Sequence, residues 1–194
     1  PGSKKRTTPL HCAAMNGHYN VYSLIMDLVE DKNPRNPSGW TPLHDAASSG
    51  HVNICQLIYE KIADSGLLLR SLRLVKKVYG INPGNNKGNT PLHSAAWNGR
   101  IEVCKFLCMN LKEKNPKDEQ DVTPLHLAAE NGYLDICKFI MEKLDDEHPK
   151  NANGKSPIHF AAQYGHLEVY KLLVENIEDK NHGEFLFPQD GSKN

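Results

Sequence analysis

The sequence lacks an excess of charge of either sign, long hydrophobic runs and the known catalytic motifs. It has 23 Lys and Arg residues against 23 Asp and Glu residues, a balance that argues against bulk electrostatic capture of nucleic acid. No run approaches the roughly 18 apolar residues that a membrane helix needs. No glycine-rich phosphate loop, HExxH or GxSxG motif is present. We therefore expect neither an enzyme nor a nucleic-acid partner.

Cysteine is also scarce, and its use points to one kind of compartment. Five cysteines in 194 residues cannot all be paired, and free thiols suggest a reducing environment. We expect the cytoplasm, with the nucleus as the alternative. Cys104 and Cys108 are four residues apart, which could support a metal pair, but no second Cys/His pair follows at zinc spacing. We expect these thiols to pack, and we expect no metal and no cofactor.

One motif is abundant, because it occurs five times. Residues 123–126 are Thr-Pro-Leu-His, and they are followed by one residue, two alanines, two further residues and Gly132. The same order begins at Thr8, Thr41, Thr90 and, with Ser-Pro-Ile-His, at Ser156. Successive copies therefore start 33, 49, 33 and 33 residues apart. A fixed period of this length indicates a repeat architecture.

Each copy predicts a pair of helices. Thr or Ser is a good N-cap, because its hydroxyl accepts a backbone N–H, and proline is tolerated at the first helical position. The alanines let a second helix approach closely, and the glycine ends the first helix with a positive φ. The second helix carries apolar residues at helical spacing: in the fourth copy Leu134, Ile136, Cys137, Phe139 and Ile140. One pair cannot bury its own apolar face, so neighbouring copies must stack.

These five copies resemble the ankyrin repeat. The resemblance covers roughly residues 7–180 and implies an all-α solenoid of helix-turn-helix repeats joined by short β-hairpin-like loops. In that family the hairpins and the inner helices line one concave face. We expect residues 1–7 to be a cloning remnant and a basic lead-in, residues 8–180 to be the repeat domain, and residues 181–194 to be a tail or a partial capping repeat. We also expect the chain to be a fragment of a longer protein.

The 49-residue spacing contains an insertion at about residues 65–80. On a helix its apolar residues fall on one stripe, opposite Arg70, Arg73 and Lys77. Two interpretations remain open. The segment, with Ser65 as the expected helix cap, either packs on the neighbouring outer helices or presents an accessory basic face to an acidic protein or an anionic membrane surface. The second interpretation is the only route to a membrane that the sequence offers.

Histidine is frequent, but most of it follows the period. Five of the ten histidines belong to the motif: His11, His44, His93, His126 and His159. In the ankyrin family this side chain hydrogen-bonds backbone between neighbouring hairpins, and the resemblance implies that role for all five. A second periodic position holds His18, His51 and His166, with Arg100 and Tyr133 in the other two copies. We expect that position to be structural as well.

The resemblance also implies that variable positions on the concave face bind the partner. We expect the partner-binding residues to be Trp40, Asp45, Ser48, Trp97, Asn98, Glu130, Asn131, Gln163 and Tyr164. Exposed tryptophan and tyrosine are favoured hot spots, although Trp40 and Trp97 could instead pack on the next repeat. Asp45 follows His44, but no nucleophile accompanies the pair, so we expect Asp45 to face solvent or a partner.

The interpretation of function is therefore non-catalytic protein–protein interaction, as in an adaptor or scaffold. One alternative is a regulatory or assembly region of a larger membrane or enzyme protein. Another is a sensor of a small ligand or a nucleotide, because Trp40, Trp97 and Lys155 could form an aromatic clamp with an adjacent cation. No spacing in the sequence places those three side chains together.

Overall fold

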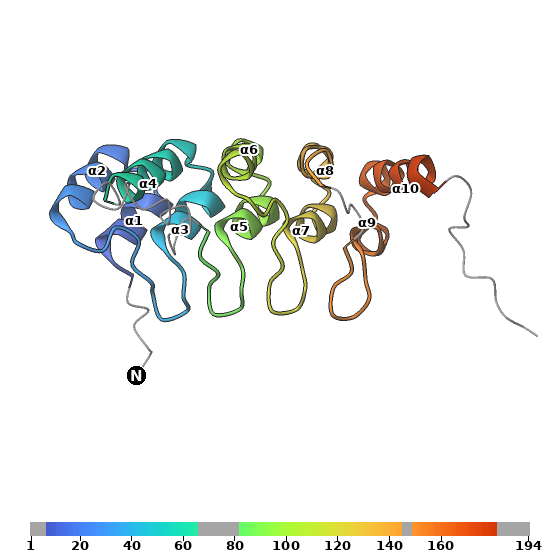
Figure 1. Cartoon of the computed structure of the whole chain (residues 1–194), viewed down its shortest axis with the longest axis horizontal. Coiled ribbons are helices and arrows are strands. Elements are labelled where there is room, and N and C mark those ends of the chain that lie inside the picture. The colour runs from blue at the N-terminus through green and yellow to red at the C-terminus, as the bar shows by residue number, and fades with distance from the viewer. Residues whose placement is uncertain (1–6, 66–81, 145–148, 182–194) are drawn as a thin grey trace, which may run out of the picture.

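Ten helices form five pairs in the computed structural model, which describes residues 7–65, 82–144 and 149–181. The inner row consists of α1 (Pro9–Met15), α3 (Pro42–Ser49), α5 (Pro91–Trp97), α7 (Pro124–Glu130) and α9 (Pro157–Tyr164). The outer row consists of α2 (Tyr19–Leu28), α4 (Val52–Ser65), α6 (Ile101–Asn110), α8 (Leu134–Met141) and α10 (Leu167–Asn181). Each helix packs against its neighbours in both rows, which gives an elongated stack (Figure 1). The predicted all-α solenoid is confirmed, and the described residues contain no strand.

The inner helices begin and end as the motif predicts. In α7, Thr123 has an extended backbone, and its N–H donates to Nδ1 of His126 at 3.2 Å as one half of a capping box. Pro124 follows at the first helical position, where a missing N–H costs little. Gly132 has a φ of +75°, a left-handed conformation that favours glycine. The predicted positive φ at the closing glycine is therefore confirmed.

The core lies between the two rows. Both alanines of the motif are buried in α3, α5 and α7, which lets the outer helices approach closely. In α8, Ile136, Cys137 and Ile140 are buried as predicted, and Leu134 and Phe139 pack at the edge of the core.

The cysteines separate into two groups. All five are free, and the four on outer helices are buried, whereas Cys12 on α1 is exposed. Burial raises the pKa of the Cys55 and Cys137 thiols to about 12, so these thiols stay protonated at neutral pH. The packing role predicted for the five cysteines is confirmed for the four buried ones and is wrong for Cys12. No group of three His, Cys, Asp or Glu side chains that could hold a metal ion occurs among the described residues.

Four similar loops project side by side from the inner row, on the side away from the outer helices (Figure 1). Residues 36–40, 85–89, 118–122 and 151–155 each form a turn in which the first N–H donates to the last carbonyl at 2.8–2.9 Å. The side-chain oxygen of the first residue, Asn or Asp, accepts two further backbone N–H groups. Adjacent loops are joined as well: Asn86 N–H donates to the Ser38 carbonyl at 3.1 Å, and Glu119 N–H donates to the Lys87 carbonyl at 3.1 Å. The loops therefore form a connected edge.

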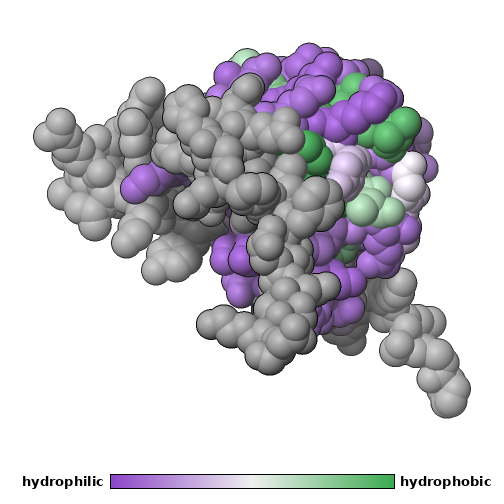
Figure 2. Space-filling model, turned by 90° about the vertical axis from the view of Figure 1, so that its right-hand side faces the viewer, coloured by the Kyte–Doolittle hydropathy of each residue, from purple (hydrophilic) through white to green (hydrophobic). Residues whose placement is uncertain are grey.

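Parts of the predicted organisation lie outside the described residues. These parts are residues 66–81, which include Arg70, Arg73 and Lys77, and residues 1–6 and 182–194 at the ends. Helix α4 includes Ser65 as its last residue, and the helix that Ser65 is expected to cap lies outside the described residues. In the described part of the chain, no helix combines the length and apolar character that crossing a membrane requires. Figure 2, a view along the stack from the α10 end, shows a mainly hydrophilic surface with scattered hydrophobic groups.

Candidate functional site: a groove on the loop side of the stack

Motif histidines fix the loops that frame the site. In the third repeat, Nδ1 of His93 accepts the Thr90 N–H at 3.1 Å, so Nε2 carries the proton and donates to the Val122 carbonyl at 3.0 Å. His11, His44 and His126 make the equivalent bond to the next loop, at 2.9–3.1 Å. Burial lowers the pKa of His44 to about 4, which keeps the ring neutral. The predicted role is confirmed for these four.

For His159 the prediction is not tested. It belongs to the last described repeat, and the residue equivalent to the acceptors above, 29 positions later, lies outside the described residues. Within the described residues its side chain is exposed and takes part only in the capping box with Ser156. The bridging role of His159 therefore stays a prediction.

The second periodic position ties the starts of α4, α6 and α10 to the repeat before each. His51 and His166 donate from Nε2 to the Met15 and Glu130 carbonyls at 3.2 and 2.8 Å, and Arg100 Nε donates to the Ser48 carbonyl at 3.0 Å. Each side chain lies against the preceding closing glycine. A Cβ on Gly132 would come within 2.5 Å of the His166 ring. The structural role expected for this position is confirmed where these contacts occur.

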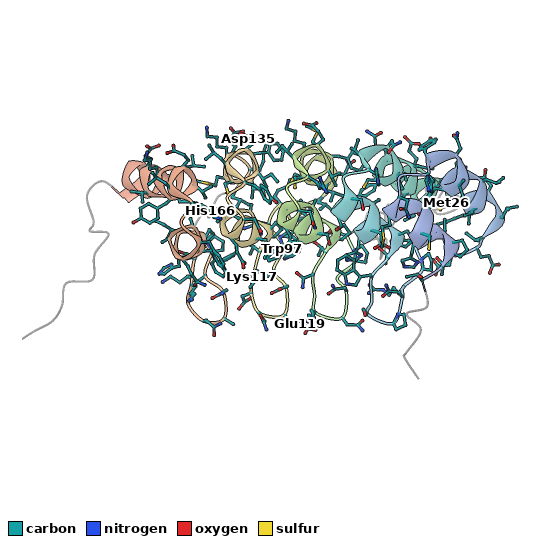
Figure 3. The ribbon with its side chains drawn as sticks, turned by 180° about the vertical axis from the view of Figure 1, so that it is seen from behind. Met26, Trp97, Lys117, Glu119, Asp135 and His166 are labelled. Atoms are coloured by element: carbon teal, nitrogen blue, oxygen red, sulfur yellow. The ribbon has the colours of Figure 1, made fainter. Side chains whose placement is uncertain are left out.

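A groove of about 750 Å³ opens between these fixed loops and the inner helices. Its wall on the loop side is formed by Pro37, Ser38, Trp40, Asn85, Asn86, Lys87 and Asn89. Its wall on the helix side is formed by His93, Ser94, Trp97 and Asn98 on and after α5, and by Leu127 on α7. The groove therefore crosses three successive repeats, and we call it the tryptophan groove. In Figure 3, Trp97 lies on the side of the inner helices that faces the loop ends, where Glu119 is labelled, and Asp135 lies at the opposite edge.

The two tryptophans of the chain both line this groove. Trp97 is 45% exposed, and Trp40 is half-buried with its ring centroid 5.3 Å from that of His44. Trp40 thus packs partly within its own repeat, whereas Trp97 presents nearly half of its surface to solvent. Within the described residues, neither indole N–H has a hydrogen-bond acceptor. The expectation that Lys155 joins the two tryptophans is wrong, because Lys155 lies in the last loop and donates to Gln163 at 3.0 Å. The lysine that lines the groove with them is Lys87.

The other expected site residues fall into two places. Asn98 lines the groove, and its Nδ2 donates to the Ser94 carbonyl at 2.8 Å and to Ser48 Oγ at 3.1 Å. Ser48 therefore contacts Asn98 without lining the groove itself. Glu130 and Asn131 close α7, and Gln163 and Tyr164 close α9. A hydrogen bond from Tyr164 to the Glu130 carboxylate raises the pKa of Tyr164, which is 49% exposed. None of these four lines the groove: Glu130 and Asn131 lie on the last repeat that the groove reaches, and Gln163 and Tyr164 lie one repeat beyond it.

Asp45 does not face solvent, so that expectation is wrong. Only 7% of its surface is exposed, and its Oδ2 is buried without a hydrogen-bond partner among the described residues. The hydroxyl of Tyr22 is also buried without a hydrogen-bond partner among the described residues. Burial raises the pKa of Tyr22, and the charges of Cys55 and Asp45 add to the rise. Desolvation raises the pKa of Asp45 to about 7. An aspartate so placed has no surface to offer a partner.

Sequence reasoning missed most of the loop-side wall. Asn85, Asn86 and Lys87 come from the loop that follows the insertion, and nothing in their sequence separates them from an ordinary polar turn. Ser94 was also missed, since the equivalent positions hold residue types as different as Asp45 and Leu127. One feature of the sequence could have predicted these residues. The residue before each motif and the residue after its histidine lie on the same face of the stack.

The groove offers binding chemistry and no obvious reaction chemistry. Its walls combine two indoles, four asparagine side chains and one ammonium group, and they include no carboxylate, cysteine or unburied histidine. The pKa of His93, its only titratable imidazole, is lowered by burial, and its two nitrogens are already bonded. Such a surface can stack on an apolar group and donate hydrogen bonds to acceptors.

The sequence matches the family model described as "Ankyrin repeats (3 copies)" over residues 1–68, 67–118 and 110–183. These matches together span nearly all of the chain. No curated protein matches it.

Proposed function

The chain belongs to the ankyrin-repeat family, and from this premise we propose that it binds a protein partner, without catalysis, through the tryptophan groove. Ankyrin repeats are generally protein–protein interaction modules, and the family is typically non-catalytic. One observation carries the choice of the groove: the only two tryptophans of the chain both line it. Tryptophan is among the residues most enriched in interface hot spots.

Rigidity supports the same proposal. Trp97 stands next to Asn98, whose amide is bonded to α3 and α5, and Trp40 stands in a loop that is bonded to the next one. A surface held in this way loses little conformational freedom when a partner binds. Ser48 and Asn98 then serve to orient the tryptophans. Glu130, Asn131, Gln163 and Tyr164 extend the contact surface toward the last repeat when the partner is longer than the groove.

The proposed setting follows from the thiols and the charge balance. Four of the five cysteines are buried and protonated, and none is paired, which suits a reducing compartment such as the cytoplasm. The equal numbers of basic and acidic residues favour a protein partner over nucleic acid.

Selection from a phage-displayed library of random dodecapeptides tests the proposal. Peptides retained by the protein are expected to bind a Trp97→Ala variant about 2 kcal/mol more weakly, the size of a hot-spot loss. The matched control is Met109→Ala, because Met109 is 76% exposed on α6 of the same repeat but belongs to the outer row. Circular dichroism must show that both variants keep the helical fold. Peptides that bind equally well without the Trp97 ring would refute the groove as the binding site.

A further inference from the structure

The geometry points to a particular class of partner for the tryptophan groove: an extended peptide segment in which an acidic residue neighbours an apolar one. The carboxylate is received by Lys87, and the apolar side chain lies against Trp97. This inference rests on the proposed function and adds to it the chemistry that the groove selects.

The shape of the groove favours an extended segment. Its walls come from the 36–40 loop, from the 85–89 loop with α5, and from Leu127 on α7, so its long axis follows the stack over three repeats. An extended chain suits a groove with a loop-side and a helix-side wall, because its neighbouring side chains point in alternate directions, one toward each wall.

The apolar requirement comes from Trp97 and Leu127. Trp97 keeps 45% of its surface exposed although it lines a groove, and Leu127 lies on the next helix along the same wall. Covering this surface with an aliphatic or proline side chain removes it from water, which is favourable in proportion to the area buried. A fully polar segment would leave the apolar surfaces of Trp97 and Leu127 exposed to water.

The acidic requirement comes from unmatched donors. Among the described residues, Lys87 is the only charged one that lines the groove, and its ammonium group has no acceptor there. The indole N–H groups of Trp40 and Trp97 are unmatched in the same part of the chain. None of the described residues that line the groove supplies a carboxylate to compete for them. The wall therefore donates hydrogen bonds and carries one positive charge, which is complementary to a single carboxylate.

The next loop along the stack limits how much negative charge the groove can accept. Glu119 N–H is bonded to the Lys87 carbonyl at 3.1 Å, so a loop that contains Asp118, Glu119 and Asp121 lies beside the backbone of the loop that carries Lys87. Lys117 is only 3.4 Å from Asp121 and offsets one of these charges. The remaining carboxylates disfavour a ligand with several negative charges, such as a nucleotide triphosphate. One carboxylate per segment is the charge that fits.

The dodecapeptide selection provides the test when it is run in parallel on the wild-type chain and on Lys87→Glu. The wild type is expected to enrich peptides with Asp or Glu next to an apolar residue, and Lys87→Glu is expected to enrich Lys or Arg at that place. Lys138→Glu is the matched control, because it makes the same charge change at an exposed site on α8, and it should select the wild-type motif.

Affinities of the selected peptides then follow from tryptophan emission, since both fluorophores of the chain lie in the groove. Replacing the peptide's acid by its amide should weaken wild-type binding about three- to fivefold, the range of an exposed ion pair. The same replacement should leave the affinity for Lys87→Met unchanged. ATP and AMP are titrated as well, and neither is expected to alter the emission at 100 μM.

Three results would overturn the inference. One is the absence of acidic residues from the Trp97-dependent peptides. Another is an identical motif selected by wild type and Lys87→Glu, which would leave the groove as a binding site without charge selectivity. The third is displacement of the peptides by ATP or AMP, which would assign the groove to nucleotides. Failure to obtain any Trp97-dependent peptide is a separate outcome, because it removes the proposed function itself.

Discussion

Gly132 and Gly165 close equivalent helices with nearly equal φ angles, +75° and +76°, but their surroundings differ. A Cβ on Gly132 would lie 2.5 Å from the His166 ring, whereas a Cβ on Gly165 would have nothing within 4 Å. Gly165→Ala should therefore cost about 1 kcal/mol of stability, from backbone strain alone. Gly132→Ala should cost about 2–4 kcal/mol, because the imidazole must move and its bond to the Glu130 carbonyl is weakened.

Urea unfolding of the two alanine variants measures this difference, and each serves as the control for the other. Equal losses of stability would mean that the contact with His166 contributes nothing and that only the backbone conformation matters at these glycines.

Asp45 predicts a dependence of stability on pH. The pKa of Asp45 is about 7 in the folded chain and 3.8 in the unfolded chain. Between about pH 4 and pH 7 the carboxyl group is therefore protonated in the folded chain and ionised in the unfolded one. Stability from this group is present below about pH 4 and is lost as pH rises through 7. Asp45→Asn should therefore be more stable than wild type at pH 8, by about 1–3 kcal/mol, the cost of an unmatched buried polar group.

The difference between Asp45→Asn and wild type should vanish at pH 4, and urea unfolding at several pH values measures it. Comparing the two proteins matters because the motif histidines act in the opposite direction. Their folded pKa values are lowered, so they add stability as pH rises, equally in both proteins. A wild type that exceeds the variant at pH 8 would show that the Asp45 carboxylate has a favourable partner.

At the scale of the helices, two lysines hold the ends of outer helices. The Lys114 ammonium donates to the Cys108 and Leu111 carbonyls at the end of α6, and Lys32 donates to the Met26 and Val29 carbonyls at the end of α2. These carbonyls have no intrahelical partner, and a positive charge there is favoured by the helix dipole. In the sequence both lysines belong to a polar connection that resembles any solvated turn.

Replacing Lys114 by methionine keeps most of the side-chain volume and removes the donor. The α6 end should then lose its bonds, and the protein should lose about 1 kcal/mol of stability. Lys112→Met is the matched control, because Lys112 is exposed two residues earlier and makes no bond in the described part of the chain. Thermal unfolding followed by circular dichroism compares them, and a control that loses as much as Lys114→Met would contradict the capping role.

The helices themselves were predictable from the sequence, since cap, proline, alanines and glycine each have a local physical reason that repeats. The burial of Asp45 was not, because the four equivalent residues, Cys12, Ser94, Leu127 and Phe160, range from exposed to buried. Trp40, Trp97 and Asn98 could be placed on one face from the repeat alone. Their meeting with Lys87 depends on how two loops pack across the insertion, and no spacing in the chain encodes that.

For the whole molecule, stability should depend on bonds between repeats. His93 is buried and joins the third repeat to the fourth, whereas His159 is exposed and joins no further loop among the described residues. His93→Ala should cost about 2–3 kcal/mol, since it removes that bond and leaves polar groups unmatched. It should also broaden the urea transition, because the two halves of the stack become less coupled.

His159→Ala removes a capping contact only and should leave a single, sharp transition. Two variants with equally broad transitions would show that coupling between repeats does not run through the motif histidines.

The most direct test of the central claim is a two-dimensional ¹H–¹⁵N NMR spectrum recorded while the tightest Trp97-dependent peptide is added. The chain has two indole N–H signals, and both come from the tryptophan groove. We predict that both signals and the backbone amides of residues 85–89 shift, while the amides of α6 and α8 stay in place. Indole signals that remain fixed while the outer-helix amides move would contradict the assignment of the groove as the binding site.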